Sequence, residues 1–129
     1  MPIHYKTVKK AEAGVKGGGR FRYHAAATKR KIVDSHDLSR MLANRCTLSR
    51  ADVTAVLTGL SELMCELLCD GKSVHFDDIG IFSTSLVSEL KDSPEEVKES
   101  SISGVRVQFR ANKELKKQLK KAKFKRVKS

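Results

Sequence analysis

The amino-acid sequence predicts an α+β fold: a helical hairpin, a three-stranded antiparallel sheet with a projecting arm and a basic C-terminal helix, preceded by extra N-terminal strands. The longest helical pattern covers residues 48–70, where apolar side chains recur at steps of three and four. After Gly71 the apolar period changes to two, which indicates strands. The helical stripe is too wide for one short neighbouring helix to cover, so it requires a sheet, a partner subunit or both.

Charge is distributed unevenly along the 129 residues, whose net charge is +11. Residues 1–33 carry nine Lys or Arg against one acidic residue, residues 34–104 carry six against thirteen, and residues 105–129 carry eleven against one. Basic ends on either side of an acidic middle indicate one polyanionic partner, nucleic acid first and an anionic membrane second. The alternative interpretation is a pair of solvated basic tails.

Sequence features disfavour membrane, secreted and enzymatic functions. No apolar run approaches the roughly 20 residues that span a bilayer, and the N-terminus lacks the apolar segment of a secretory signal, so we expect a cytoplasmic protein. The glycines at 17–19 lack the GK[ST] of a phosphate-binding loop, and no Ser, His and Asp are spaced as a catalytic set. We therefore expect no enzyme, no cofactor and no small-molecule substrate.

The three cysteines are too few and too scattered for a disulfide framework. Cys65 and Cys69 lie one helical turn apart, but neither His36 nor His75 completes a familiar zinc spacing. We therefore expect no metal site, and small thiols that are buried or half-buried.

Two short strands are predicted at residues 3–10 and 20–27, where apolar and aromatic residues alternate with basic ones. The glycine-rich connector between them predicts a hairpin or a mobile loop. Strand packing is expected to bury Phe21 and Tyr23, which would leave Phe124 as the remaining candidate for base stacking. The sequence KFKRV near the C-terminus is a candidate last strand.

A helical hairpin is predicted next. Its first helix runs from Asp34 to about Arg45, and its second begins at Ser49, which forms a capping box with Asp52. Gly71 then ends the second helix, because glycine leaves a helix at least cost. The apolar stripe of this helix consists of Val53, Val56, Leu57, Leu60, Leu63, Met64, Leu67 and Leu68.

Two strands follow, at about residues 74–76 and from Ile79 to about Ser88, with an Asp-Asp turn between them. Gly80, between apolar residues, indicates a bulge or a close backbone approach. Residues 89–103 are polar and charged, which is typical of an extended connection or a projecting arm.

The return strand has one apolar and one basic face. Such a strand suits a sheet that packs on helices behind and faces phosphates in front. The apolar residues Val105, Val107 and Phe109 alternate with Arg106, Gln108 and Arg110.

A final helix, capped by Asn112, is predicted to carry a thin apolar stripe of Leu115, Leu119 and Ala122. Its other side carries five lysines, whose repulsion costs roughly a few tenths of a kcal/mol per pair and therefore indicates a polyanionic ligand. These lysines are Lys113, Lys116, Lys117, Lys120 and Lys121.

Two motifs in this order resemble the HU/IHF family of bacterial histone-like proteins. Ile79-Gly80-Ile81-Phe82 is similar to the family's GFGxF turn, and residues 109–116, FRANKELK, are similar to its FRAGKxLK block. The N-terminal segment resembles the additional strands of a variant HU-like subfamily. The predicted parts are therefore a basic strand extension at 1–33, an HU-like domain at 34–122 with an arm at about 86–104, and a basic tail at 123–129.

The resemblance implies an intertwined homodimer, with a heterodimer of paralogues left open, whose strands form a saddle and whose two arms reach around the DNA minor groove. Binding would be mainly to phosphates and to bendable duplex DNA with little base readout, as in a nucleoid protein that condenses DNA. The second subunit would cover the surplus stripe of the long helix. The implied dimer core is Leu57, Leu60, Met64, Leu67, Phe76, Ile79, Phe82 and Phe109.

The predicted arm departs from the family pattern. Family arms are rich in Arg and carry a wedging Pro near the tip, whereas Pro94 lies next to Glu95 and Glu96, which phosphates would repel. DNA contact is therefore expected to move from the arm tips to the basic ends. The candidate DNA-binding residues are Arg106, Arg110, Lys113, Lys116, Lys117, Lys120 and Lys121, with Lys29, Arg30 and Lys31 as secondary candidates.

Two other functions stay open at this point. An RNA-binding or ribosome-associated protein would explain the charge equally well. A protein-interaction module that kept the fold and lost DNA bending is favoured by the acidic arm.

Overall fold

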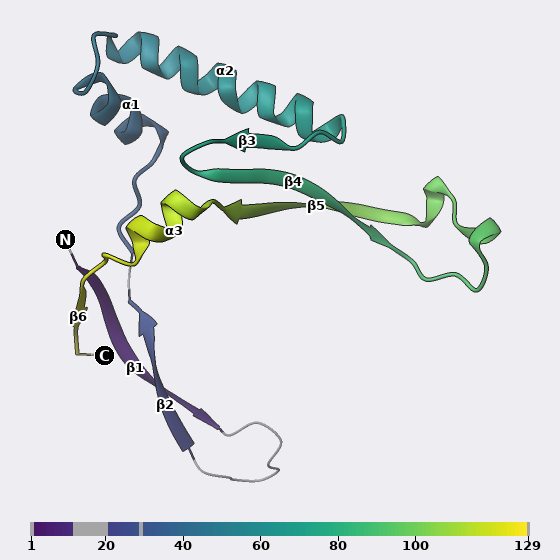
Figure 1. Ribbon diagram of the computed structural model, residues 1–129, viewed down its shortest axis with the longest axis horizontal. Coiled ribbons are helices and arrows are strands. Elements are labelled where there is room, and N and C mark those ends of the chain that lie inside the picture. The colour runs from purple at the N-terminus through teal and green to yellow at the C-terminus, as the bar shows by residue number, and fades with distance from the viewer. Residues whose placement is uncertain (1, 12–20, 29, 129) are drawn as a thin grey trace. The chain divides into compact units, whose positions relative to one another are not determined.

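The structure is a computed structural model that describes residues 2–11, 21–28 and 30–128. It is an α+β fold, as predicted (Figure 1). The predicted glycine-rich connector lies outside the described residues, as does Lys29.

The chain forms two compact units. The central unit comprises residues 34–117, and the terminal unit comprises residues 1–33 together with 118–129. Both ends of the chain therefore belong to one unit, a pairing that no sequence pattern indicates. The predicted partition into 1–33, 34–122 and 123–129 stays a prediction.

The helical hairpin of the central unit consists of α1 (Ser35–Ala43) and α2 (Arg50–Cys69). Both helices begin with the predicted type of cap: the Asp34 carboxylate accepts from the Asp37 N–H at 2.9 Å, and the Ser49 hydroxyl accepts from the Asp52 N–H at 3.1 Å. Helix α2 ends as predicted at Gly71, whose φ of 77° favours glycine.

The Asp34 cap has an electrostatic consequence. The hydrogen bond from the Asp37 backbone holds the pKa of the Asp34 carboxyl below its ordinary value, although partial desolvation opposes the shift. The Asp37 side chain and the nearby His36 lower the pKa further. The cap of α1 is therefore charged at neutral pH, whereas the Ser49 cap of α2 is a neutral hydroxyl.

The central sheet is antiparallel, with the order β3 (Val74–Phe76), β4 (Gly80–Ser88) and β5 (Ile102–Ala111). The predicted close approach at Gly80 is confirmed, because a Cβ there would collide with the backbone carbonyl oxygen of Arg110. A bulge near Val87 interrupts the otherwise regular β4–β5 register.

Residues 89–101, called the hairpin tip here, connect β4 to β5 and lie away from α1 and α2 in Figure 1. The tip is folded rather than fully extended, because it contains two short 3₁₀ helices, η1 (Pro94–Glu96) and η2 (Glu99–Ser101). The buried Ser101 closes it: its carbonyl accepts from the Glu89 N–H at 2.9 Å, and its hydroxyl accepts from the Lys98 N–H at 3.1 Å.

The core of the central unit is small. The ring of Phe82 lies 5.9 Å from that of Phe76 and 4.9 Å from that of Phe109, centroid to centroid. Helix α2 lies against β3 and β4. Among the described large apolar side chains, only Val53, at 5% exposure, is buried, whereas Phe109 is 46% exposed. One copy of the chain thus leaves much of its apolar surface in water.

Helix α3 (Lys113–Leu119) begins as predicted at Asn112, whose side-chain oxygen accepts from the Leu115 N–H at 2.9 Å. The Asn112 side-chain amide also donates to the Asp77 carbonyl, and no non-glycine residue described has positive φ, so Asn112 acts as a cap rather than as a glycine substitute. The helix is shorter than predicted. The Lys123 carbonyl accepts from the Ile3 N–H at 2.7 Å, so the chain must leave the helix before it reaches that residue.

The terminal unit contains a three-stranded sheet with the order β2 (Phe21–Ala27), β1 (Ile3–Ala11) and β6 (Phe124–Arg126). The three predicted strands are confirmed. Strand β1 pairs antiparallel with β2 and parallel with β6, which joins the two ends of the chain in one sheet.

The cysteines differ from the prediction. Cys46, Cys65 and Cys69 are free and exposed. Cys46 lies in the connection between α1 and α2, and Cys65 and Cys69 lie on α2, of which a single chain covers only a narrow part. Within the described ranges, no three His, Cys, Asp or Glu residues are grouped so that they could hold a metal ion. No described helix is long and apolar enough to cross a membrane.

Candidate nucleic-acid interface

Strand β5 presents its two kinds of side chain on opposite faces. Phe109 points to the aromatic core, where its ring contacts Phe82, so the alternating Arg106 and Arg110 lie on the other face. Arg110 pairs with Ile81, and Ile81 pairs in turn with His75 on β3. Both arginines are exposed. This face of the central sheet therefore carries the two arginines, as the alternation in β5 predicts, together with the apolar Ile81.

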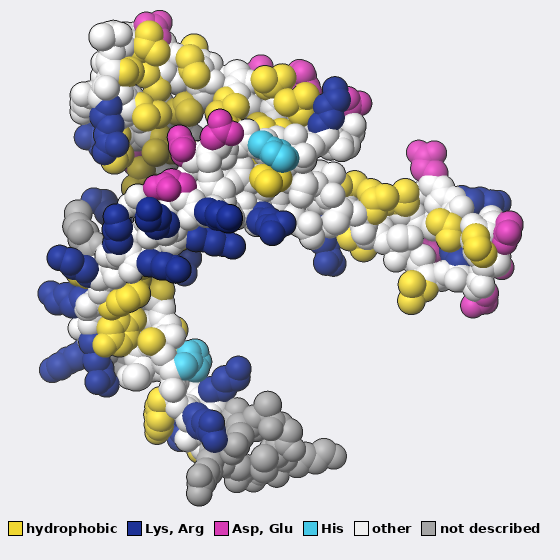
Figure 2. Space-filling model, in the orientation of Figure 1, with side chains coloured by type: hydrophobic (Ala, Val, Ile, Leu, Met, Phe, Trp, Pro, Cys, Tyr) yellow, Lys and Arg dark blue, Asp and Glu magenta, His cyan; other side chains and the backbone are white. Residues whose placement is uncertain are grey.

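Helix α3 continues the same positive charge. The Asn112 cap places Lys113 three residues after Arg110, and Lys116 and Lys117 follow one turn later on the helix. Figure 2 shows Lys and Arg side chains gathered over α3 and the adjoining end of β5. We call this set the basic strip, and its members are Arg106, Arg110, Lys113, Lys116 and Lys117.

The other predicted DNA-binding residues lie in the terminal unit. Lys120 and Lys121 follow α3 in a turn rather than on the helix, because α3 ends at Leu119. Arg30 and Lys31 are exposed and line a shallow hollow together with Pro2, His4 and Thr28. The structure therefore brings five of the predicted residues together in the central unit and assigns these four to the terminal unit.

Charge separates the two units more sharply than it separates segments of the sequence. The terminal unit holds fifteen Lys or Arg against Glu12 alone, a net charge of +14. The central unit holds eleven against fourteen acidic residues, a net charge of −3. A division of the chain by position misses this contrast, because it cannot reveal that both ends form one sheet.

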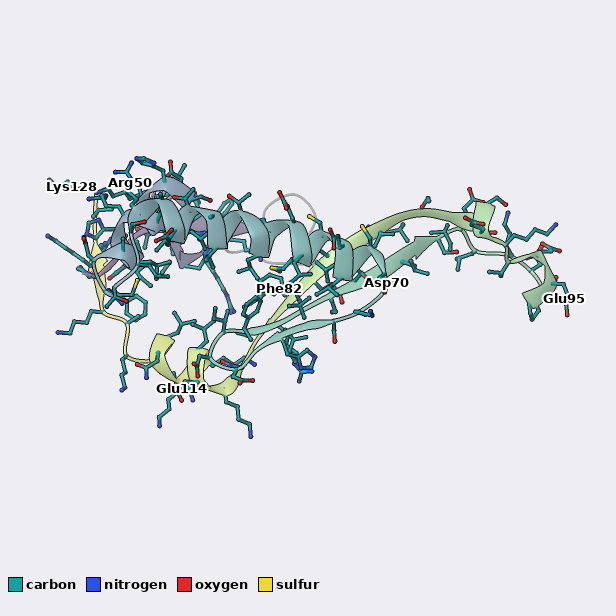
Figure 3. All side chains as sticks on the ribbon, turned by 90° about the horizontal axis from the view of Figure 1, so that it is seen from above. Arg50, Asp70, Phe82, Glu95, Glu114 and Lys128 are labelled. Atoms are coloured by element: carbon teal, nitrogen blue, oxygen red, sulfur yellow. The ribbon has the colours of Figure 1, made fainter. Side chains whose placement is uncertain are left out.

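The hairpin tip is acidic, and carboxylates directly follow its proline. Pro94 begins η1 directly before Glu95 and Glu96, and Lys91 is paired with Glu89 at 3.2 Å. Residues 86–104 hold five acidic side chains against two lysines. Figure 3 shows the labelled Glu95 at the tip, at the opposite end of the β4–β5 hairpin from Glu114 on α3. The basic strip therefore runs from Arg106, in the middle of β5, to α3 at the end of the hairpin opposite the tip.

The terminal sheet also has two different faces. Residues that are paired across strands, or two apart along a strand, point to the same side of a sheet. One side, called the aromatic face here, carries apolar and aromatic residues with two cations among them. By register it comprises Ile3, Tyr5, Thr7 and Lys9 of β1, Phe21 and Tyr23 of β2, and Phe124 and Arg126 of β6.

Two contacts confirm which residues share the aromatic face. The Lys9 ammonium lies 4.0 Å above the ring centroid of Phe21, and the Arg126 guanidinium donates to the Thr7 hydroxyl at 3.4 Å. The opposite side, called the basic face here, carries His4, Lys6, Lys10, His24 and Lys125.

The prediction that strand packing buries Phe21 and Tyr23 is wrong, and Phe124, the remaining candidate for base stacking, is exposed as well. Phe21 is 53% exposed, Tyr23 67% and Phe124 70%. The described residues of the terminal unit form three strands and their connections, with only the last two residues of α3, so they supply no helical layer over this sheet. The sequence shows where these aromatics are but does not distinguish a covered strand from an uncovered one, because alternation looks the same in both.

Known proteins resemble this chain in family and in fold. The family model HU-HIG, described as an HU domain fused to wHTH, Ig or glycine-rich motif, matches residues 1–126. A Bacteroides vulgatus crystal structure, described as a candidate bacterial DNA-binding protein, has a TM-score of 0.65 at 17% identity over 97% of this chain and 48% of that one. The Anabaena HU protein from a cocrystal with DNA has a TM-score of 0.53 at 18% identity over 67% of this chain and 96% of that one.

At these identities the two solved structures show an HU-like fold. The chain spans about half the length of the Bacteroides protein, 48%. No curated protein matches it.

Proposed function

This chain belongs to the HU-HIG family, and from that premise we propose that it is a dimeric, histone-like protein that binds duplex DNA mainly through its phosphates. Phosphate contacts by Lys and Arg give affinity without base readout, so low sequence specificity follows. Condensation of DNA in the bacterial nucleoid, bending of the duplex where its sequence deforms easily, and the lack of any enzymatic role belong to the same proposal.

The observation that carries the DNA-binding proposal is the basic strip. Its five cations lie within one strand and the helix that follows it, against Glu114 as the single acidic residue between Arg106 and Lys117. An unbalanced strip of this kind repels itself in the free protein, and a polyanion relieves that repulsion. Lys120 and Lys121 extend the positive charge along the chain.

Uncovered apolar surface supports the dimer. Much of the apolar surface of α2 and of the adjoining turn stays accessible in one copy: Val56 is 60% exposed, Leu63 50% and Ile79 47%. A second subunit that covers these side chains would remove them from water, which is favourable. The proposed core combines half-buried residues with exposed ones: Leu57, Leu60, Met64, Leu67, Phe76 and Phe82 are half-buried, and Ile79 and Phe109 are exposed.

The acidic hairpin tip supports DNA contact away from the arm ends. Phosphates would repel Glu95 and Glu96, so a wedge at Pro94 is disfavoured. Leu90, at 99% exposure, is an apolar side chain that the sequence pattern did not single out, but it lies on the same acidic tip. The tips are therefore proposed to contribute little to affinity.

A double substitution in the basic strip tests the proposal. Lys116→Ala/Lys117→Ala should weaken binding to a nicked or mismatched duplex and reduce the slope of log K against log salt by about one unit for each phosphate that the variant no longer binds. Binding would be measured by fluorescence anisotropy at several salt concentrations, with the mass in solution from sedimentation. Lys91→Ala/Lys98→Ala, which removes the same charge from the tip, and Glu95→Gln/Glu96→Gln should not weaken binding. An unchanged slope in the Lys116/Lys117 variant would refute the assignment.

The acidic tip also favours a second candidate, an HU-fold protein-interaction module without DNA bending. A dimer that shows no salt-sensitive affinity for duplex DNA at moderate ionic strength would decide for it.

A further inference from the structure

The terminal sheet has properties that duplex binding by the basic strip does not explain. Three of the rings on its aromatic face, Phe21, Tyr23 and Phe124, are each more than half exposed, and its unit carries a net charge of +14. We propose that this face binds single-stranded nucleic acid, with bases stacked on its aromatic rings and phosphates held by its cations. This activity goes beyond the proposed duplex binding and uses different residues.

The aromatic rings are spaced along the sheet in two groups. Phe21 and Tyr23 are two residues apart on β2, beside Lys9. Phe124 is level with Ile3 on the other edge strand, next to Tyr5. The levels of Tyr5 and Lys9 on β1 are about 13 Å apart, at about 3.3 Å per residue. An extended single strand could therefore place bases on both groups, whereas paired bases in a duplex keep their flat faces stacked on one another.

Cations alternate with these rings on the same face. Lys9 lies over Phe21 at 4.0 Å from the ring centroid, so a cation and not a packed core covers one flat side of that ring, which is still half exposed. Lys9 has a flexible stem and can move aside to a phosphate when a base takes its place. The Arg126 guanidinium donates to the Thr7 hydroxyl at 3.4 Å, which holds it between the two aromatic groups. The sugar-phosphate backbone of a strand that crosses the sheet would pass this point. Rings and cations in this mixture are what stacking sites for single strands require.

Charge also argues against a second copy of the terminal unit as the occupant of this face. A second copy of the terminal unit would bring a further +14 against the first, with Glu12 as the only acidic residue in each. Face-to-face association of two such units is electrostatically unfavourable. A nucleic-acid strand, in contrast, neutralises this charge and fits the flat rings as well.

The first test compares single strands with duplex. The full-length protein would be titrated into fluorescein-labelled oligo(dT) of about 15 nucleotides and, separately, into a matched duplex. Phe21→Leu/Tyr23→Leu keeps apolar bulk in β2 but removes both rings. Each ring removed should weaken oligo(dT) binding by about fivefold or more, so the double variant should bind oligo(dT) at least about 25-fold more weakly. Its affinity for the duplex should not change. Equal weakening for both ligands, or none for oligo(dT), overturns the proposal.

A matched control separates stacking from charge. Lys6→Ala/Lys10→Ala removes two cations from the basic face and no ring. Because both lysines lie on the side away from the proposed strand, their removal should leave the affinity for oligo(dT) and its salt slope nearly unchanged, and it should not reproduce the selective weakening seen when the rings are removed. The basic-strip variant Lys116→Ala/Lys117→Ala should keep its oligo(dT) affinity, so failure of the duplex proposal and failure of this one can be told apart.

A second test reads stacking directly and does not depend on the stability of the leucine variant. The chain contains no Trp, so Tyr23→Trp introduces a single indole on the aromatic face. Its emission should be quenched by oligo(dT), with affinity retained or increased. No quenching would overturn the proposal. An emission change with phosphatidylserine vesicles in place of oligo(dT) would also overturn it and would assign the face to a membrane. A fall in the solution mass when the rings are removed would overturn it as well and would assign the face to a second copy of the chain.

Discussion

The central unit has a helical hairpin, fourteen acidic residues and a narrow basic strip, whereas the terminal unit has a three-stranded sheet, one acidic residue and cations on both faces of that sheet. In the central unit, the many acidic residues limit the positive charge to β5 and α3. In the terminal unit, a single acidic residue opposes fifteen basic ones. The difference shows that net charge alone would not have led to the proposed duplex-binding surface, because the unit with the HU-like helices and sheet is net negative.

The two units also differ in how they can be observed. All the α-helices of the described residues lie between Ser35 and Leu119, so helical circular dichroism reports mainly on the central unit. Both tyrosines, Tyr5 and Tyr23, lie in the terminal sheet, so tyrosine fluorescence reports on the terminal unit. The two signals allow each substitution below to be assigned to a unit.

The largest expected effect is at Gly80. Gly80→Ala should destabilise the central unit by about 2–3 kcal/mol, because the added Cβ collides with the Arg110 carbonyl and the backbone cannot yield as a flexible side chain would. Urea unfolding would show an earlier loss of helical circular dichroism with tyrosine fluorescence unchanged. Gly104→Ala in the adjacent strand is the matched control, because a Cβ there meets nothing within 4 Å. Equal destabilisation at both positions would contradict the close backbone approach at Gly80.

A smaller effect is expected at the cap of α2. Ser49→Ala removes the hydroxyl that accepts from the Asp52 N–H and should cost about 1 kcal/mol, again in the circular dichroism transition alone. Ser61→Ala in the same helix is the control. The Ser61 hydroxyl bonds back to the Leu57 carbonyl inside the helix, so its removal should be neutral or slightly stabilising. If both variants behave alike, capping is not what fixes the start of α2.

The smallest effect separates α1 from α2 by pH. Because the folded-state pKa of Asp34 is lowered, its capping contribution is fully present above the ordinary carboxyl value, 3.8, and is lost as the pH falls through the folded value. NMR Cα shifts should show the first turn of α1 fraying in acid while the hydroxyl-capped start of α2 persists. Simultaneous fraying of both helices would show that general acid unfolding, and not the Asp34 cap, governs α1.

Local features of the fold could be predicted well. The two capping boxes, the glycine that ends α2, the Asn112 cap and the tight backbone contact at Gly80 all follow from residues within a few positions of each other or from glycine alone. The candidate site was predicted in part. The basic strip follows from alternation in β5 and from a short lysine-rich helix.

Other features could not be predicted, because they depend on what covers a surface. Alternation predicts that Phe21 and Tyr23 share a side of β2, but it cannot show that both rings are more than half exposed. Helical periodicity placed Ala122 on α3, yet the chain leaves the helix at Leu119 to reach β1. The exposed thiols of Cys65 and Cys69 have the same cause, since a helical pattern does not say how much of the helix one chain can cover.

The sequence by itself determined the elements and where each begins, because caps, glycines and side-chain period act over one or two turns of chain. Only the tertiary structure decided that Ile3 lies beside Phe124. A pairing between residues so far apart depends on the path of the whole chain, and no local pattern encodes it. That pairing gathers the charge of both ends into one unit and aligns its aromatic rings on one face.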